Sequence, residues 1–238
     1  MAGLTYLSFH GVFLLPPILL LSAAAVRSSP RRRDAVGLGL LVAMAVAYTA
    51  PWDAHLIRRG VWRYGAGVVA YRIGDVPAEE YLFFVLQTVL TGLWFYRCDA
   101  AFGRRSADRR SVANPVGAVG WLLVAAVGVG LLGRPSTFYL GATLAWAAPV
   151  LAFQWGYGGG HLWAARRAWA TAVAVPTGYL WFADGVALDA GLWHISPTHT
   201  TGLSAAGLPV EEAVFFLLTN LLVVQGLLLF DRVVDGWA

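Results

Sequence analysis

The chain has 238 residues, of which 58% are hydrophobic and only 13% charged, and its formal net charge is +4. A soluble domain carries about 25% charged residues, so this composition excludes an ordinary soluble domain and indicates a membrane protein. All 17 basic residues are arginines, and they cluster in short loops between apolar segments. Arginines in such loops orient membrane helices. We therefore expect this positive charge to serve placement in a lipid bilayer, and we expect no binding of nucleic acid. The single cysteine, Cys98, excludes an intrachain disulfide.

The first apolar segment, TYLSFHGVFLLPPILLLSAAAV, covers residues 5–26. No basic residue precedes it, and RSSPRRR follows it, which is the reverse of a secretion signal. We therefore expect a first membrane span whose N-terminus lies outside the cell.

Seven segments are long and apolar enough to approach the 20 residues that cross a bilayer. They predict an all-α, polytopic protein with seven transmembrane helices. Their approximate ranges are 4–26, 35–52, 78–97, 115–133, 137–155, 168–184 and 209–230. The glycine-rich run GYGGGH at 156–161 is expected to be a flexible loop.

The arginines predict the orientation of these spans. Seven spans place 12 arginines on the side of the C-terminus and 5 on the side of the N-terminus, so the positive-inside rule predicts an outside N-terminus and a cytoplasmic C-terminus. The loop at 52–77 is also basic, against this trend. The first group is Arg27, Arg31, Arg32, Arg33, Arg97, Arg104, Arg105, Arg109, Arg110, Arg166, Arg167 and Arg232, and the second is Arg58, Arg59, Arg63, Arg72 and Arg134.

An internal repeat joins the two halves of the chain. The motif PxEExxFF occurs at 77–84 and again at 209–216, an offset of 132 residues, and Pro17 and Asp99 match Pro149 and Asp231 at the same offset. An offset of 131 relates Asp53 to Asp184 and Trp62 to Trp193, so one inserted residue reconciles the two offsets. We expect a first repeat at 1–110, a linking span at 111–135 and a second repeat at 136–238. One linking span gives both three-helix repeats the same orientation, so they are parallel repeats.

The four glutamates of the chain form two pairs, Glu79-Glu80 and Glu211-Glu212, each at the start of a predicted span. An acidic first turn after proline is an ordinary helix start. However, the pair recurs in the duplicate, and ionisable groups within spans are generally functional. Parallel repeats place both pairs at one depth, where one glutamate of each pair can face a shared chamber because adjacent helical residues point about 100° apart. Two carboxyl groups close together in a dry chamber share a proton, which provides one acid and one base.

Two further pairs of residues repeat at the outer ends of spans. Asp53 and Asp184 are predicted to end spans 2 and 6, either as plain terminal residues or as helpers of the glutamates. Trp62 and Trp193 belong either to an interfacial aromatic belt or to a chamber wall that stabilises a cation.

Other signals are weak. GVGLLG at 128–133 lies within a span and has no acidic residue about 20 positions later, so it is not a dinucleotide fingerprint. Four potential ligands share one loop, but their spacing fits no familiar metal site, and we expect no metal. They are Asp184, Asp189, His194 and His199.

The duplicated PxEExxFF motif, with FHGVFLLPPILLL at 9–21 and TAPWDAHLIRRGVWRYG at 49–65, resembles the small membrane-integral lycopene cyclases of the heterodimeric type, here fused into one chain. The resemblance covers both repeats but not the linking span, and Ala213 replaces the aromatic Tyr81 in the second repeat. It implies conversion of the open ψ-ends of lycopene, or of a related carotenoid, into β-rings to give γ-carotene and β-carotene without a flavin or any other cofactor. It also implies association with other membrane enzymes of the carotenoid pathway.

The residues fit that chemistry. Ring closure needs an acid that protonates an alkene, an apolar wall that tolerates a cation, and a base. We expect one carboxyl of Glu79 or Glu80 and one of Glu211 or Glu212 to form the acid–base pair, with Asp53 and Asp184 in support. The aromatic residues expected to contact the substrate are Trp62, Trp193, Phe83, Phe84, Phe215 and Phe216.

The main alternative is a seven-span transporter of small solutes, since small sugar carriers also have parallel three-helix repeats. A carrier needs polar groups at mid-membrane, and the spans offer few beyond Gln87, Asn220 and Gln225. A retinal photoreceptor needs a lysine, which this chain lacks. A structural subunit that depends on a catalytic partner is a further alternative.

Overall fold

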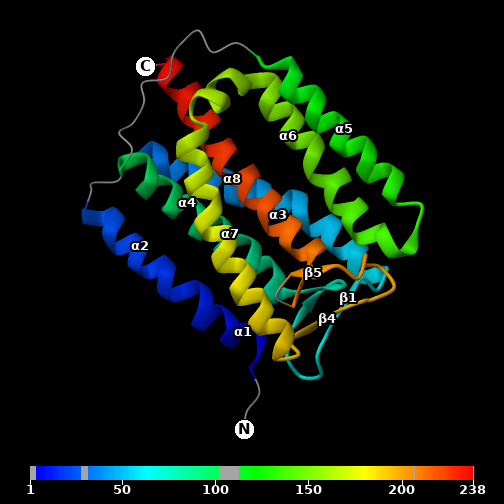
Figure 1. Ribbon diagram of the computed structural model, residues 1–238. Helices are drawn as coiled ribbons and strands as arrows, with labels where there is room; N and C mark the ends of the chain where they lie inside the picture. Colours follow the sequence, from blue (N-terminus) through cyan, green and yellow to red (C-terminus); the bar gives the residue numbers. More distant parts are fainter. Residues whose placement is uncertain (1–3, 28–31, 102–112, 206, 238) are drawn as a thin grey trace.

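A computed structural model of the chain describes residues 4–27, 32–101, 113–205 and 207–237, and it is mainly helical (Figure 1). The predicted all-α class is confirmed. The helices are α1 (Tyr6–Phe9), the π-helix η1 (His10–Leu14), α2 (Leu15–Arg27), α3 (Arg32–Arg58), α4 (Ala78–Ala101), α5 (Pro115–Leu131), the 3₁₀ helix η2 (Pro135–Thr137), α6 (Phe138–Ala164), α7 (Arg166–Asp189) and α8 (Val210–Trp237).

Several expectations lie outside the described residues. The boundary between the first repeat and the linking span, at 110/111, is one of them, and the last residue of the second repeat, 238, is another. Five of the arginines used for the orientation also fall there: Arg31, Arg104, Arg105, Arg109 and Arg110.

Among the described residues, four stretches are long and apolar enough to cross a membrane: 6–25, 32–58, 135–164 and 210–234. Helix α5 is apolar but shorter, with 17 residues. The composition of the described helices therefore supports a membrane protein, and the full count of seven spans stays a prediction.

The flexible loop expected at 156–161 is wrong, because these residues lie within α6. Gly158 has a non-helical backbone (φ −144°, ψ 27°) that kinks the helix there. A Cβ at Gly158 would collide with Leu229 of α8, and one at Gly159 with Asn114 at the start of α5. The glycines therefore allow close helix packing rather than a loop.

The helices pack as two interlocked units. Helices α4 and α8 contact each other at the centre; α4 also packs on α2, α3 and α7, and α8 on α6, α7 and α3 (Figure 1). Exchanging the equivalent helices, α2 with α6, α3 with α7 and α4 with α8, reproduces this set of contacts. The duplication seen in the sequence is thus also a duplication in space, and α5 packs on the outside of α6.

Short strands join the repeats at the end where α4 and α8 begin. They are β1 (Trp62–Tyr64), β2 (Arg72–Ile73), β3 (Val76–Pro77), β4 (Trp193–Ile195), β5 (Ser204–Ala205) and β6 (Leu208–Pro209). β1 pairs with β4 in antiparallel register, with Arg63 opposite His194. Since these two residues are related by the repeat offset of 131, the equivalent strands of the two repeats form one sheet. The hairpins β2–β3 and β5–β6 then lead directly into α4 and α8.

Candidate active site

A small cavity of about 50 Å³ lies where α4 and α8 begin, beneath the β1–β4 sheet. Four acidic side chains line it, one from each of four helices: Asp53 of α3, Glu80 of α4, Asp184 of α7 and Glu212 of α8. Each repeat contributes one aspartate and one glutamate. None of the described residues that line the cavity carries a positive charge, so these carboxyl groups face one another without a counter-ion.

The two aspartates lie deeper in their helices than the sequence predicts. Helix α3 continues to Arg58 and α7 to Asp189, so Asp53 and Asp184 lie about one turn inside the helix rather than at its end. Both are buried, with 2% and 3% of their surface exposed. The interpretation as plain terminal residues is therefore wrong.

Tyrosines and tryptophans hold the acids in place. The Tyr64 hydroxyl donates to Glu80 Oε1 at 2.6 Å, and Trp62 Nε1 donates to the same hydroxyl at 3.1 Å. Burial raises the pKa of Tyr64, and the nearby Glu80 raises it further, so this hydroxyl keeps its proton and acts as a donor.

The second repeat uses different donors. The Tyr139 hydroxyl donates to Glu212 Oε1 at 2.9 Å, and Trp193 Nε1 donates to Asp184 Oδ1 at 3.1 Å. The second oxygens of Asp53 and Asp184, both buried, have no hydrogen-bond partner. An unsatisfied buried oxygen is costly to leave, and such groups in a native site often have a catalytic role.

The rest of the wall is aromatic. All six predicted aromatic residues line the cavity: Trp62, Trp193, Phe83, Phe84, Phe215 and Phe216. Trp52 lies parallel to Phe215, with ring centroids 5.6 Å apart and planes inclined by 3°. Trp62 and Trp193 are both buried in this wall, so they do not belong to an interfacial aromatic belt. The π-faces of such a wall can stabilise a cation that has no polar partner.

Comparison with known proteins agrees with this arrangement. The sequence model of the family described as lycopene cyclase matches residues 4–98 and 136–230, that is, the two repeats without the linking segment. The chain belongs to the lycopene cyclase family.

Relatives of the family cover the chain closely. The chain is 45% identical to a lycopene beta-cyclase of Halobacterium salinarum, over 98% of both chains. It is 36% identical to a bifunctional lycopene cyclase/phytoene synthase of Aspergillus niger, over 82% of this chain and 35% of that protein. It is 35% identical to the protein of the same description from Gibberella fujikuroi, over 97% of this chain and 40% of that protein. No solved structure matches the chain.

The other glutamate of each pair faces away from the cavity. Glu79 Oε1 accepts a hydrogen bond from the backbone N–H of Ala70 at 2.6 Å. Glu211 Oε1 accepts from the backbone N–H and the hydroxyl of Thr201, at 2.7 and 2.8 Å. Ala70 and Thr201 are related by the same offset of 131. In each repeat of this cyclase, the glutamate that faces away from the cavity therefore ties a loop to the start of a helix. We name these loops lid 1 (residues 61–77) and lid 2 (the described residues 192–205 and 207–209).

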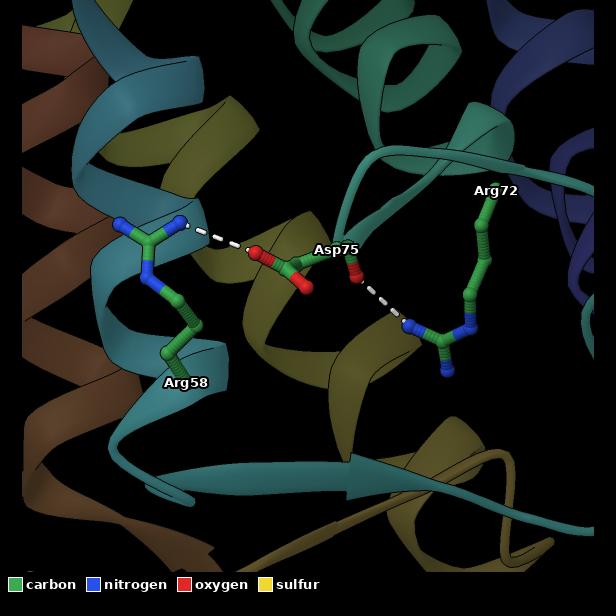
Figure 2. Close-up of polar contacts among 3 residues, drawn as sticks. All are labelled: Arg58, Arg72 and Asp75. Atoms are coloured by element: carbon green, nitrogen blue, oxygen red, sulfur yellow. Dashed lines mark hydrogen bonds and ion pairs between the residues drawn. The ribbon is translucent and has the colours of Figure 1, made fainter.

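Lid 1 has a further attachment at the surface. Arg58 Nη1 forms an ion pair with Asp75 Oδ2 at 3.0 Å, and Arg72 Nη1 donates to the Asp75 carbonyl at 2.7 Å (Figure 2). The Arg72 guanidinium also lies 5.3 Å from the centre of the Tyr64 ring. These contacts position the strand from which Tyr64 reaches Glu80.

Sequence reasoning missed several residues of the cyclase cavity, among them Tyr6, Phe9, Trp52, Tyr64 and Tyr139. One signal was available: Tyr6 and Tyr139 both lie in the first turn of the first helix of their repeat, at an offset of 133 rather than 132. The π-helix η1 lies between Tyr6 and Pro17 and accommodates the extra residue. Tyr64 left no such signal, because Ile195 occupies its position in the second repeat.

Proposed function

We propose that this chain is a lycopene beta-cyclase, which converts the ψ-ends of lycopene into β-rings with no net redox change. The observation that carries the proposal is the presence of Glu80 and Glu212 in one aromatic cavity, whose described lining residues carry no positive charge. Family membership and the Halobacterium relative support the same activity.

The chemistry follows from four carboxyl groups in one apolar cavity. Burying several negative charges together without a counter-ion is strongly unfavourable, so some of these groups hold a proton and can act as acids while another acts as a base. We assign this exchange to Glu80 and Glu212. Their hydrogen-bonding tyrosines orient them.

The reaction then takes three steps. The protonated glutamate transfers its proton to the terminal alkene of the ψ-end, which leaves a tertiary carbocation. The neighbouring alkene attacks this cation, forms the ring C–C bond and moves the charge onto a ring carbon. The ionised glutamate takes a proton from the adjacent carbon, and that C–H electron pair becomes the ring double bond. One proton enters and one leaves, so no electron acceptor is consumed and we expect no cofactor.

The cavity wall protects the cation. The aromatic rings stabilise positive charge, and so do Asp53 and Asp184 when ionised. Lids 1 and 2 cover the cavity, and exclusion of water prevents capture of the cation as an alcohol. Glu79 and Glu211 contribute by holding these lids.

We further propose seven spans with an outside N-terminus and a cytoplasmic C-terminus, in which the helices α4, α5 and α7 cross the membrane beside the four more apolar stretches. Arg58 and Arg72 lie at the lid end of the molecule, whereas Arg166 and Arg167 begin α7 at the other end. A fluorescent protein that matures only in the cytoplasm, fused to the C-terminus, tests the orientation. Fluorescence is expected, and its absence with normal expression contradicts it.

Association with other enzymes of the carotenoid pathway is also proposed. In the fungal relatives a lycopene cyclase and a phytoene synthase share one chain, which supports close contact between these activities. Chemical crosslinking in membranes that contain both enzymes, followed by detection of the synthase, tests it.

The transporter alternative is not favoured. Gln87 Nε2 donates to the Thr219 hydroxyl at 2.7 Å, and Asn220 accepts from Thr91 at 2.6 Å and donates to Thr177 at 2.9 Å. These mid-helix polar groups bind one another and so are engaged in helix packing rather than offered to a cargo.

The deciding experiment is expression of the chain alone in cells that accumulate lycopene, with pigment analysis. β-Ring products are expected. Glu80→Gln and Glu212→Gln should each lower the rate by about 100-fold or more, the usual contribution of a general acid or base. Glu79→Gln and Glu211→Gln are matched controls, since they make the same change one residue away, and they should retain most of the activity. Full product formation by Glu80→Gln and Glu212→Gln would contradict the assignment.

A further inference from the structure

The small cavity between Glu80 and Glu212 cannot hold a whole carotenoid. Lycopene is a C40 hydrocarbon whose extended length is comparable to the hydrocarbon thickness of a bilayer, about 30 Å. The unreacted polyene therefore needs a second site that is continuous with the first.

A larger groove, of about 390 Å³, lies next to the cavity, between α3 and α6, with α4 and α8 as its floor. Phe84 and Phe215 line both spaces, so the two are adjoining. A chain of stacked rings runs from one to the other: Tyr48 on Trp146 at 5.5 Å, Trp146 on Trp52 at 4.7 Å, and Trp52 on Phe215 at 5.6 Å. Flat aromatic surfaces suit a flat conjugated chain.

The groove wall is mostly apolar, and several of its polar atoms are bound within the protein, although Gln154 Oε1 has no hydrogen-bond partner among the described residues. Gln87 is bound to Thr219, whose hydroxyl donates to the backbone carbonyls of Phe215 and Phe216. Gln154 Nε2 donates to the Leu222 carbonyl. A hydrocarbon therefore fits this groove better than a polar solute does.

The groove opens where α3 faces outward. Met44 and Tyr48 line it and are 54% and 45% exposed, and in a bilayer this exposed face of α3 contacts lipid. A hydrocarbon dissolved in the membrane can enter sideways from there without crossing water.

Building on the proposed function, we propose that the groove between α3 and α6 binds the unreacted polyene of the carotenoid and admits it from the bilayer. The catalytic cavity takes one end of the chain, so the protein closes one ring at a time. The second ring requires the molecule to leave and return with its other end first, and a pulse of lycopene should release γ-carotene before β-carotene.

The test compares two substrates. The first is lycopene, and the second is a short hydrocarbon with the same ψ-end and a chain that ends within the catalytic cavity. Ala47→Phe places a ring in the groove, which Ala47 lines. Ala43→Phe makes the same change on an exposed position of α3 that does not line the groove, and it is the matched control.

We expect Ala47→Phe to lower kcat/KM for lycopene at least 10-fold while the rate with the short substrate stays at the wild-type value, and Ala43→Phe to change neither. An unchanged rate of Ala47→Phe with lycopene would mean that the groove holds bilayer lipid, and would overturn the proposal. If the wild-type protein cyclises neither substrate, the proposed function fails instead.

A second measurement decides the case in which Ala47→Phe loses activity with both substrates through misfolding. In Met44→Cys, lycopene should slow alkylation of the introduced thiol by a lipid-soluble maleimide by 5-fold or more. An alkylation rate that lycopene does not change would overturn the proposal.

Discussion

In the first half of the cavity, Glu80 accepts a hydrogen bond from Tyr64, which itself accepts one from Trp62. In the second half, Ile195 stands at the position of Tyr64, and Trp193 donates directly to Asp184. Glu212 is held instead by Tyr139 of α6. Two glutamates in identical surroundings would have equal acidity, and neither would be favoured as the acid. Two nearby carboxyl groups that share a proton already provide an acid and a base, and the divergence of their partners gives each glutamate a preference for one of the two roles.

The lids differ in the same way. Both glutamates that face away from the cavity accept a backbone N–H from equivalent residues, Ala70 and Thr201. Lid 2 adds the Thr201 hydroxyl, whereas lid 1 adds the surface ion pair of Arg58 and Asp75 (Figure 2). The duplicated backbone contact closes the cavity on both sides, and each repeat has reinforced it by different means.

After substitution of the two cavity glutamates, substitution of Asp53 or Asp184 should have the largest effect on the cyclisation rate. Asp53→Asn and Asp184→Asn are each expected to lower the cyclisation rate by on the order of 100-fold, because each removes one of the four carboxyl groups that share protons in the cavity. Initial rates in membranes, normalised to protein content, measure this. Asn at 184 can still accept from Trp193, so a loss there reports the carboxyl group and not the hydrogen bond. Wild-type rates for both variants would exclude a role of these carboxyl groups in the proton transfers.

Removing a tyrosine hydroxyl that binds a cavity glutamate should lower the cyclisation rate by less. The size of this effect should differ between the first repeat and the second. Tyr139→Phe is expected to lower the rate by about 10-fold, since one hydrogen bond contributes about 1 kcal/mol or more. Tyr64→Phe should lower it less, because Tyr6 also lies beside Glu80 in the cavity wall. Rates of both single variants and of Tyr6→Phe combined with Tyr64→Phe test this order. A larger loss in Tyr64→Phe than in Tyr139→Phe would reverse the comparison.

The sequence predicted the parts of this site that the duplication repeats. Glu80 and Glu212, Asp53 and Asp184, and the paired tryptophans and phenylalanines each occur twice at a fixed offset, so their spatial convergence followed from parallel repeats. Which glutamate of each pair faces the cavity was left open, because a helix start alone does not fix the rotation of the helix about its axis.

The parts that the sequence did not predict are those in which the repeats differ or the backbone departs from a regular helix. Tyr64 has no counterpart, and Tyr6 and Tyr139 are out of register by the residue that η1 accommodates. The helical continuation through Gly158 depends on contact with α8, and a tertiary contact of this kind overrides the local preference of glycine for loops. The groove is formed by four helices distant in sequence and left no local pattern.

Loosening the lids should affect stability more than chemistry. Glu79→Gln and Glu211→Gln each replace a charged acceptor with a neutral one, which weakens a hydrogen bond by about 1 kcal/mol. The temperature of half-inactivation in detergent should fall for both, and further for Glu211→Gln because Glu211 accepts two hydrogen bonds. An unchanged temperature in both would show that the lids are held by their other contacts.

The smallest effect is expected from the surface ion pair of lid 1. The side chains of Arg58 and Asp75 are 56% and 51% exposed, and exposed pairs contribute about 0.2–1 kcal/mol because water and salt screen them. Arg58→Ala should therefore lower the temperature of half-inactivation only slightly, and the difference from wild type should vanish in 1 M salt, where the Debye length is about 3 Å. Asp189→Ala, at the matching position of the second repeat, is the control. If Arg58→Ala instead lowers activity as much as Tyr64→Phe at unchanged stability, the pair acts by positioning Tyr64 through β1. Lid 1 would then be part of the device that distinguishes Glu80 from Glu212, and not only a cover.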